Sequence, residues 1–217
     1  MKKDLILVAA LIALSSCFNS GEARAQSEEL QRFEVGVHFS SLTLDTSSTT
    51  EAGLGVRFTY NATKNIAFEA EGNLFPHDAR ARAQLDGGRG AEGLFGVKIG
   101  KRYEKFGIFA KARPGLISFT RGKFNIVPNN DGSSFPFDLH TERLTHFAFD
   151  VGGVLEFYPT RRIVARFDAG DTIIRYGDTT LDTFSGPAGG PFTPLQFTVP
   201  GNITHNFQFT AGVGFRF

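Results

Sequence analysis

The sequence has no tryptophan, a single cysteine and no long apolar run after residue 20. One cysteine cannot form a disulfide within the chain or supply a cysteine-ligated metal site. A transmembrane helix needs roughly 20 consecutive apolar residues, and no stretch beyond residue 20 provides them. An excess of one charge is also missing, because 23 Lys and Arg stand against 22 Asp and Glu without acidic or basic blocks. These absences exclude a disulfide scaffold and a helical membrane protein, and nothing indicates nucleic-acid binding.

Phenylalanine and glycine are abundant instead. The chain has 24 Phe against 4 Tyr, together with 25 Gly, in 217 residues. That length suits one domain preceded by a leader.

The first 25 residues have the pattern of an export signal. Lys2 and Lys3 give a positive start, residues 5–14 are apolar, and an A-x-A site ends at Ala25. Such a segment is removed from the mature protein, which leaves 26–217 as the folded domain. Residues 14–17 also resemble a lipobox, so acylation of Cys17 is the alternative to cleavage after Ala25.

Strict alternation of apolar and polar residues dominates the rest of the chain. In residues 206–217, Phe207, Phe209, Ala211, Val213, Phe215 and Phe217 share one face, which predicts a strand between two different media. The same pattern predicts eight strands, at residues 32–42, 53–60, 66–75, 90–100, 106–119, 145–158, 163–176 and 206–217. Pro76 is expected to end the third strand, since proline cannot donate to a ladder.

The connections are predicted to alternate in length. Long loops at 43–51, 76–89, 120–144 and 177–205 alternate with short turns at 61–65, 101–105 and 159–162. In an up-and-down antiparallel sheet, all long loops then lie at one end, as in bacterial outer-membrane barrels. The predicted fold class is an all-β, eight-stranded antiparallel up-and-down transmembrane β-barrel.

Two orientations of the faces are possible. A soluble lipocalin-like barrel turns its apolar face inward, whereas a membrane barrel turns it toward lipid. Here the polar face mixes charges of both signs with glycines such as Gly55 and Gly96. Glycine makes room for long charged side chains inside a narrow barrel, so the pattern favours the membrane orientation.

Residues 93–102, 106–115 and 150–159 are similar to segments of small outer-membrane β-barrel (OmpA-like, porin family) proteins of Gram-negative bacteria. The resemblance implies an outer-membrane location. We expect a monomer surrounded by outer-membrane lipid, without a cofactor. The resemblance also implies that the barrel-assembly machinery recognises the last strand through Phe209, Val213, Phe215 and Phe217. Such barrels host unrelated functions, so the activity does not follow from the resemblance.

Charged residues of the polar face are the first candidates for function. They could form a narrow ion path, or an ion-pair network that plugs the lumen because an unpaired buried charge is costly. The candidates are Arg57, Glu69, Glu71, Glu92, Lys98, Lys111, Arg113, Glu156, Arg166 and Asp168.

Catalysis and metal binding have weaker signals. Barrel enzymes that modify lipid A use Ser and His near the outer rim, and the available residues are His38, His140, His146, His205, Ser40, Ser41 and Ser118. No G-x-S-x-G elbow is present, and neither 140–142 nor Asp168 with Asp171 has a recognised metal spacing. We therefore expect no enzyme activity, no metal and no cofactor.

Aromatic residues in the two longest predicted loops suggest either a contact surface for a surface ligand or a cap on the barrel. These residues are Phe124, Phe135, Phe137, Phe184, Phe192 and Phe197. The expected role is structural or adhesive, through the long loops. A narrow pore for ions or small solutes is the alternative, and a lipid A-modifying enzyme a more distant one.

Overall fold

The computed structural model describes residues 31–46, 48–79, 87–128, 137–185 and 193–217. The predicted leader, including Cys17 and Ala25, lies outside the described residues, as do Phe135 and Phe192. Within the described ranges, no helix has the length and apolar character needed to cross a membrane.

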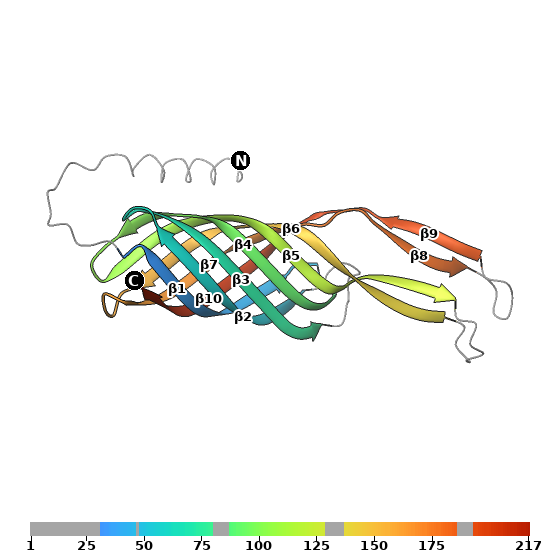
Figure 1. Cartoon of the computed structure of the whole chain (residues 1–217). Coiled ribbons are helices and arrows are strands. Elements are labelled where there is room, and N and C mark those ends of the chain that lie inside the picture. The colour runs from blue at the N-terminus through green and yellow to red at the C-terminus, as the bar shows by residue number, and fades with distance from the viewer. Residues whose placement is uncertain (1–30, 47, 80–86, 129–136, 186–192) are drawn as a thin grey trace, which may run out of the picture. The chain divides into compact units, whose positions relative to one another are not determined.

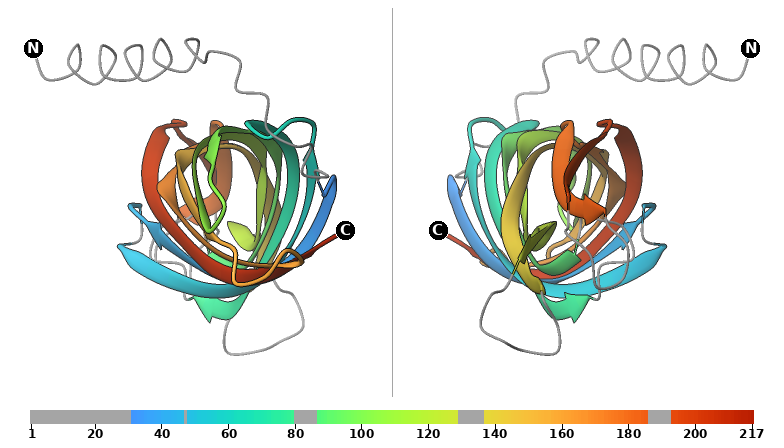
Figure 2. Two further views of the ribbon diagram at one scale, coloured as in Figure 1. Left: turned by 90° about the vertical axis from the view of Figure 1, so that its left-hand side faces the viewer. Right: turned by 90° about the vertical axis from the view of Figure 1, so that its right-hand side faces the viewer.

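Ten strands are described, and eight of them close into an antiparallel barrel (Figures 1 and 2). Around the barrel the order is β1-β10-β7-β6-β5-β4-β3-β2, while β8 and β9 form a separate two-stranded sheet. The predicted eight-stranded barrel is therefore confirmed. The strands are β1 (Phe33–Leu44), β2 (Thr49–Asn61), β3 (Ile66–Ala79), β4 (Gly87–Arg102), β5 (Phe106–Pro128), β6 (Phe137–Phe157), β7 (Ile163–Arg175), β8 (Thr179–Ser185), β9 (Thr193–Val199) and β10 (Ile203–Arg216).

Side chains of each wall strand alternate between an exposed, mostly apolar outer face and a buried inner face that carries charged and polar residues along part of its length. In β1, Val35 and Val37 are exposed on the outside, while Glu34 and His38 are buried inside. Because side chains alternate along a strand, the alternating sequence pattern places charges inside the barrel all around its wall.

The barrel closes between its first and last strands. β10 pairs with β1 on one side, as at Val37 and Val213, and with β7 on the other. Backbone hydrogen bonds join Phe33 and Phe217 in both directions, at 3.0 and 2.9 Å. β10 is thus the closing strand that its alternation suggested.

Three short turns connect β2 to β3, β4 to β5 and β6 to β7, at residues 62–65, 103–105 and 158–162. We call this side of the barrel the short-turn end. The predicted long loop 43–51 is wrong: β1 reaches Leu44 and β2 begins at Thr49, so only residues 45–48 connect them. Polar Thr43 and Thr50 pair across the strands, with their hydroxyls 3.0 Å apart. Threonine is common in strands, and a polar segment at a barrel rim needs no loop.

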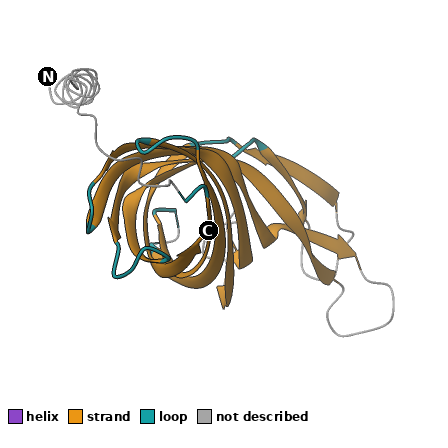
Figure 3. Ribbon diagram, turned by 60° about the vertical axis from the view of Figure 1, so that its left-hand side comes forward, coloured by secondary structure: helices purple, strands orange, loops and turns teal. Residues whose placement is uncertain are grey.

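The predicted loop 120–144 is largely strand. Pairing of β5 with β6 continues from Lys123 and Glu142 to Pro128 and Phe137. β4 and β7 do not reach this level, because β4 pairs with β5 only as far as Arg121 and β7 pairs with β6 only as far as Phe147. The two strands therefore extend beyond the wall as a two-stranded ribbon, the β5–β6 extension, and β8 lies beside β5 (Figures 1 and 3).

The predicted loop 177–205 contains the β8–β9 hairpin. Its base is fixed by two backbone amides: Tyr176 donates to the Asn202 carbonyl (2.9 Å), and Gly201 donates to the Asp178 carboxylate (2.7 Å). The hairpin and the β5–β6 extension lie at the same end of the barrel, called here the hairpin end.

The prediction that Pro76 ends the third strand is wrong. β3 continues to Ala79, and the pairing with β4 shifts register after Phe75. A proline is tolerated at such an irregularity because no ladder bond needs its missing N–H.

Candidate functional site: the interior of the barrel

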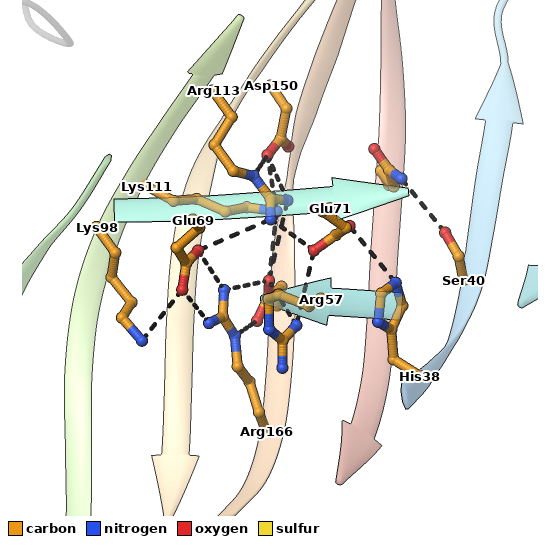
Figure 4. A network of polar contacts seen from close by, with 12 residues as sticks. His38, Ser40, Arg57, Glu69, Glu71, Lys98, Lys111, Arg113, Asp150 and Arg166 are labelled. Carbon is orange, nitrogen blue, oxygen red and sulfur yellow. Dashed lines mark hydrogen bonds and ion pairs between the residues drawn. The ribbon is translucent and has the colours of Figure 1, made fainter. Parts of the chain in front are cut away.

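Inward-facing side chains of all eight barrel strands fill the interior, and those nearest the short-turn end are mostly charged. Figure 4 shows part of the resulting polar network, around Arg113 and Arg166. Seven carboxylates face seven cationic groups. We call these fourteen residues the charged section: Glu34, Glu69, Glu71, Glu92, Asp150, Glu156 and Asp168 with Arg57, Lys98, Arg102, Lys111, Arg113, Arg166 and Arg216.

Arg113 bridges two of the carboxylates. Its Nε donates to Asp150 Oδ2 at 2.8 Å, and its Nη1 donates to Glu71 Oε2 at 2.6 Å. β5 supplies Arg113, β6 Asp150 and β3 Glu71, so one guanidinium ties three strands together.

Arg166 forms the second bridge. It donates through Nε to Asp168 Oδ1 at 2.6 Å and through Nη2 to Glu69 Oε2 at 2.9 Å. Lys98 continues the chain of contacts, with its ammonium 3.2 Å from Glu69 and hydrogen-bonded to Glu156. Short charge-assisted bonds of this kind offset the cost of burying both charges.

Two cations have looser contacts. Lys111 Nζ lies 3.0 Å from Asp150 and 3.7 Å from Asp168. Arg57 Nη1 is 3.6 Å from Glu71 and 3.9 Å from Asp168, and none of its nitrogens makes a hydrogen bond within the described residues.

Amides and an imidazole lie at the edge of the charged section that is nearer the hairpin end. Asn73 and Gln208 donate to Glu92 Oε2 at 2.7 and 2.9 Å, and no cation of the described residues forms an ion pair with it. His38 Nε2 lies 2.7 Å from Asn73 Oδ1, and Gln208 also reaches Ser40 at 3.3 Å. Glu92 is thus held by neutral donors alone.

Tyr158 organises the mouth at the short-turn end. Arg102 donates to the Tyr158 hydroxyl (3.0 Å), which donates to Glu156 (2.7 Å), and Arg216 stacks on the ring at 4.2 Å. Burial and the nearby Glu156 carboxylate raise the pKa of the Tyr158 phenol. The hydroxyl therefore stays protonated and keeps donating.

Apolar side chains cluster in the other half of the interior, next to buried polar side chains such as His146 and Asn206. We call them the apolar plug: Leu42, Leu44, Phe75, Leu94, Ile117, Phe119, Ala148, Ile174 and Tyr176. All nine are buried, and Leu144 and Val199 pack against them from the hairpin end. The interior therefore has a charged section and an apolar plug in series along the barrel.

Comparisons with known proteins give architecture alone. No family model and no curated protein sequence matches the chain. Solved structures with similar folds include Neisserial surface protein A (13% identity, TM-score 0.49, covering 85% of this chain and 97% of that one). The N-terminal barrel of Pseudomonas aeruginosa OprF (12%, 0.42, 85% and 97%) and Escherichia coli outer membrane protein W (20%, 0.40, 88% and 100%) are also similar. The role of this chain has to be argued from its own residues.

The interior holds all ten charged residues that the sequence singled out, and it brings nine of them into ion pairs, with Glu92 the exception. Val213, Phe215 and Phe217 lie exposed on the outer face of β10, and Phe209 is half-buried there. Their proposed part in assembly remains a prediction.

The Ser and His candidates for catalysis are scattered. His38 and Ser40 are enclosed in the interior, His146 lies beside Tyr176 with ring centroids 4.6 Å apart, and His205 pairs with Asp171 at 2.6 Å. His140 is exposed, Ser41 is half-buried, and Ser118 accepts a hydrogen bond from Thr145 at 3.1 Å. Within the described ranges, no three His, Cys, Asp or Glu gather in a way that could hold a metal ion.

Sequence reasoning left Glu34, Arg102, Asp150 and Arg216 out of the network and missed the apolar plug. The plug had a readable signal in β1. Its inward positions run from Glu34 to Ser40 and then to Leu42 and Leu44, so the inner face changes from polar to apolar along one strand.

Proposed function

We propose that this chain is an integral outer-membrane β-barrel without enzyme activity, whose role is structural and adhesive. The observation that carries the proposal is the combination of a filled interior with two strand hairpins that project from one end. The barrel would serve as a rigid anchor, and the hairpins would make contacts outside the membrane.

The outer face supports membrane insertion. Leu54, Phe95 and Ile203 on three different strands are 69%, 61% and 62% exposed, and apolar residues occupy outward positions all round the wall. Soluble proteins rarely expose a continuous apolar surface of this extent. An apolar surface of this kind suits contact with lipid. The closed barrel also suits a membrane, because its wall leaves no unpaired strand edge in the lipid.

The projecting hairpins support the contact role. β9 exposes Leu195 and Phe197 on the same face, and Thr180 and Thr198 present hydroxyls on the opposite face. Of the loop aromatics expected from the sequence, only Phe197 has a described side chain, and it is 45% exposed. Apolar side chains among hydroxyls on a rigid scaffold suit recognition of another surface.

The interior favours an anchor over a pore. Ion pairs link its charges, and the apolar plug adds a cluster of packed apolar side chains toward the hairpin end. A bare ion among apolar side chains is strongly disfavoured. We therefore expect no steady conductance.

Cell adhesion tests the proposal. The chain is expressed at the surface of a non-adherent Gram-negative host, and binding to surfaces coated with laminin, fibronectin or heparin is counted. Its matched variant replaces residues 179–199 with a short Gly-Ser linker between the paired Tyr176 and Asn202. We expect adhesion with the full chain and its loss in the variant, while both fractionate with the outer membrane and show the heat-dependent gel mobility of a folded barrel.

Planar-bilayer recording tests the alternative, a narrow pore for ions or small solutes. The full chain should give no steady current, and neither should the hairpin variant. Steady current that disappears when Arg113 or Glu156 is replaced would contradict the filled-anchor proposal and favour a narrow pore.

A further inference from the structure

The short-turn end carries an exposed ring of positive charge. All three short turns or their flanks contribute to it, and so does the start of β1. We call these residues the basic rim: Arg32, Lys64, Lys101, Lys105, Arg161 and Arg162, all of which are exposed. Among the described residues of this rim, Glu104 is the one exposed acidic side chain.

Charges at the hairpin end are mixed. Among the side chains that the structure describes at this end, the accessible cations face a similar number of acids, and neither sign prevails. The residues are Arg89, Arg121, Lys123, Arg143 and Arg175 against Asp45, Glu142, Asp171 and Asp178. The basic rim is therefore a property of one end of the barrel and does not follow from overall composition.

Tight turns hold the rim cations in place. Thr63 Oγ1 accepts a hydrogen bond from the Ile66 amide at 3.0 Å, and Thr160 Oγ1 accepts one from Ile163 at 3.0 Å. Such side-chain-capped turns limit the backbone freedom of the residues between them. The cations accordingly project from ordered turns.

An aromatic band lies directly beside the basic rim. Tyr103 stacks on Phe106 with ring centroids 4.6 Å apart, and Lys101 Nζ lies 5.5 Å from the Tyr103 ring. Across the barrel from this pair, the Phe33 ring packs against the rings of Tyr60 and Phe217, with centroids 5.4 and 5.9 Å apart. Aromatic rings next to cationic side chains are typical of the level where a bilayer meets water.

We propose that the basic rim binds the phosphate headgroups of anionic phospholipids in the leaflet at the short-turn end. This inference rests on the proposed membrane insertion. The cations are spread around the perimeter over three separate turns, which suits a planar array of headgroups better than one compact ligand. Positive side chains at this level attract anionic headgroups over roughly a Debye length.

Lipid selectivity measured by electron spin resonance tests the inference. The full chain is reconstituted in phosphatidylcholine bilayers with trace spin-labelled phosphatidylglycerol or phosphatidylcholine. At low salt we expect phosphatidylglycerol to be preferred at the protein surface by about fivefold. The preference should fall toward unity at about 1 M salt, where screening is strong.

Two matched variants locate the effect. One replaces Lys64, Lys101, Lys105, Arg161 and Arg162 with Gln, and the other replaces Arg89, Arg121, Lys123, Arg143 and Arg175 with Gln. The first should lose the preference and the second should keep it, with both folded by gel mobility. A preference that is absent in the full chain, or unchanged in the first variant, would overturn the inference.

The remaining outcomes separate the inference from its foundation. Failure of the full chain to insert into phosphatidylcholine bilayers would contradict the membrane barrel itself. A different result would be that the full chain co-sediments with purified peptidoglycan, shows no phosphatidylglycerol preference, and loses the co-sedimentation in the first variant. The basic rim would then bind the cell wall, and the proposal that it binds phospholipid headgroups would be wrong.

Discussion

The charged section and the apolar plug occupy equivalent inward positions of the same strands, yet they are stabilised in different ways. In the charged section, side chains as long as Arg113 and Arg166 are fully buried and held by directional ion pairs. In the apolar plug, Phe75 and Ile117 are buried just as deeply and held by packing alone.

The two halves should differ in how much stability a single substitution costs. A buried ion pair depends on both partners, because removing one leaves an uncompensated charge. A packed apolar residue loses contacts in proportion to the atoms removed. The charged section should therefore respond sharply to single substitutions and recover when the partner is also neutralised, whereas the apolar plug should respond gradually.

The largest effect is expected for Arg113→Met. This change removes the guanidinium that bridges Asp150 and Glu71. It should lower the free energy of unfolding by about 3–5 kcal/mol, measured by urea denaturation in lipid vesicles. Adding Asp150→Asn should restore part of the loss. Arg175→Met, on the exposed outer surface, is the control and should change stability by less than about 0.5 kcal/mol. Equal losses in both single variants would contradict the special role of the interior pair.

A smaller effect is expected for Ile117→Ala in the apolar plug. The lost methyl groups leave a cavity among Leu94, Phe119 and their neighbours, which should cost about 2–4 kcal/mol in the same denaturation experiment. Ile203→Ala removes the same atoms from the outer face and serves as the control, with a clearly smaller cost. If the two isoleucine variants lose the same stability, the plug is not a packed core.

The smallest effect is expected for Glu92→Gln. Glu92 accepts hydrogen bonds from Asn73 and Gln208 and has no ion-pair partner within the described part of the chain. A glutamine oxygen can accept both bonds. The free energy of unfolding near pH 7 should change by less than about 1 kcal/mol. A loss as large as that of Arg113→Met would mean that Glu92 balances a cation at longer range.

Much of the barrel could be predicted from alternation alone. From Asn206 to Arg216, for example, β10 keeps apolar residues outward and polar residues or glycine inward, so its existence and orientation followed from a period of two. The ends of strands were harder. Outside the wall, β5 pairs with β6 in the extension and β8 pairs with β9 in the hairpin. These segments lack the two-faced pattern of the wall strands, so their Ser, Thr, Gly and Pro residues indicated loops.

The interior was predictable in kind and not in detail. The alternation sorted Arg113 and Glu71 onto the inner face, but the partner of each charge depends on strand stagger, which one sequence does not encode. Glu92 illustrates the limit, since its residue type indicated an ion pair and its neighbours proved to be amides. Phe75 and Ile174 belong to the plug because both face inward near the hairpin end of their strands.

Pairing of β1 with β10 has a consequence for the order of folding. Most other neighbours in the wall are joined by turns or hairpins, whereas this seam brings together the first and last strands of the described chain, as at Glu34 and Arg216. Joining such remote segments carries the largest loop-closure entropy in the molecule. The seam should consequently form last and open first, and until it forms β1 presents an unpaired edge that another chain could occupy.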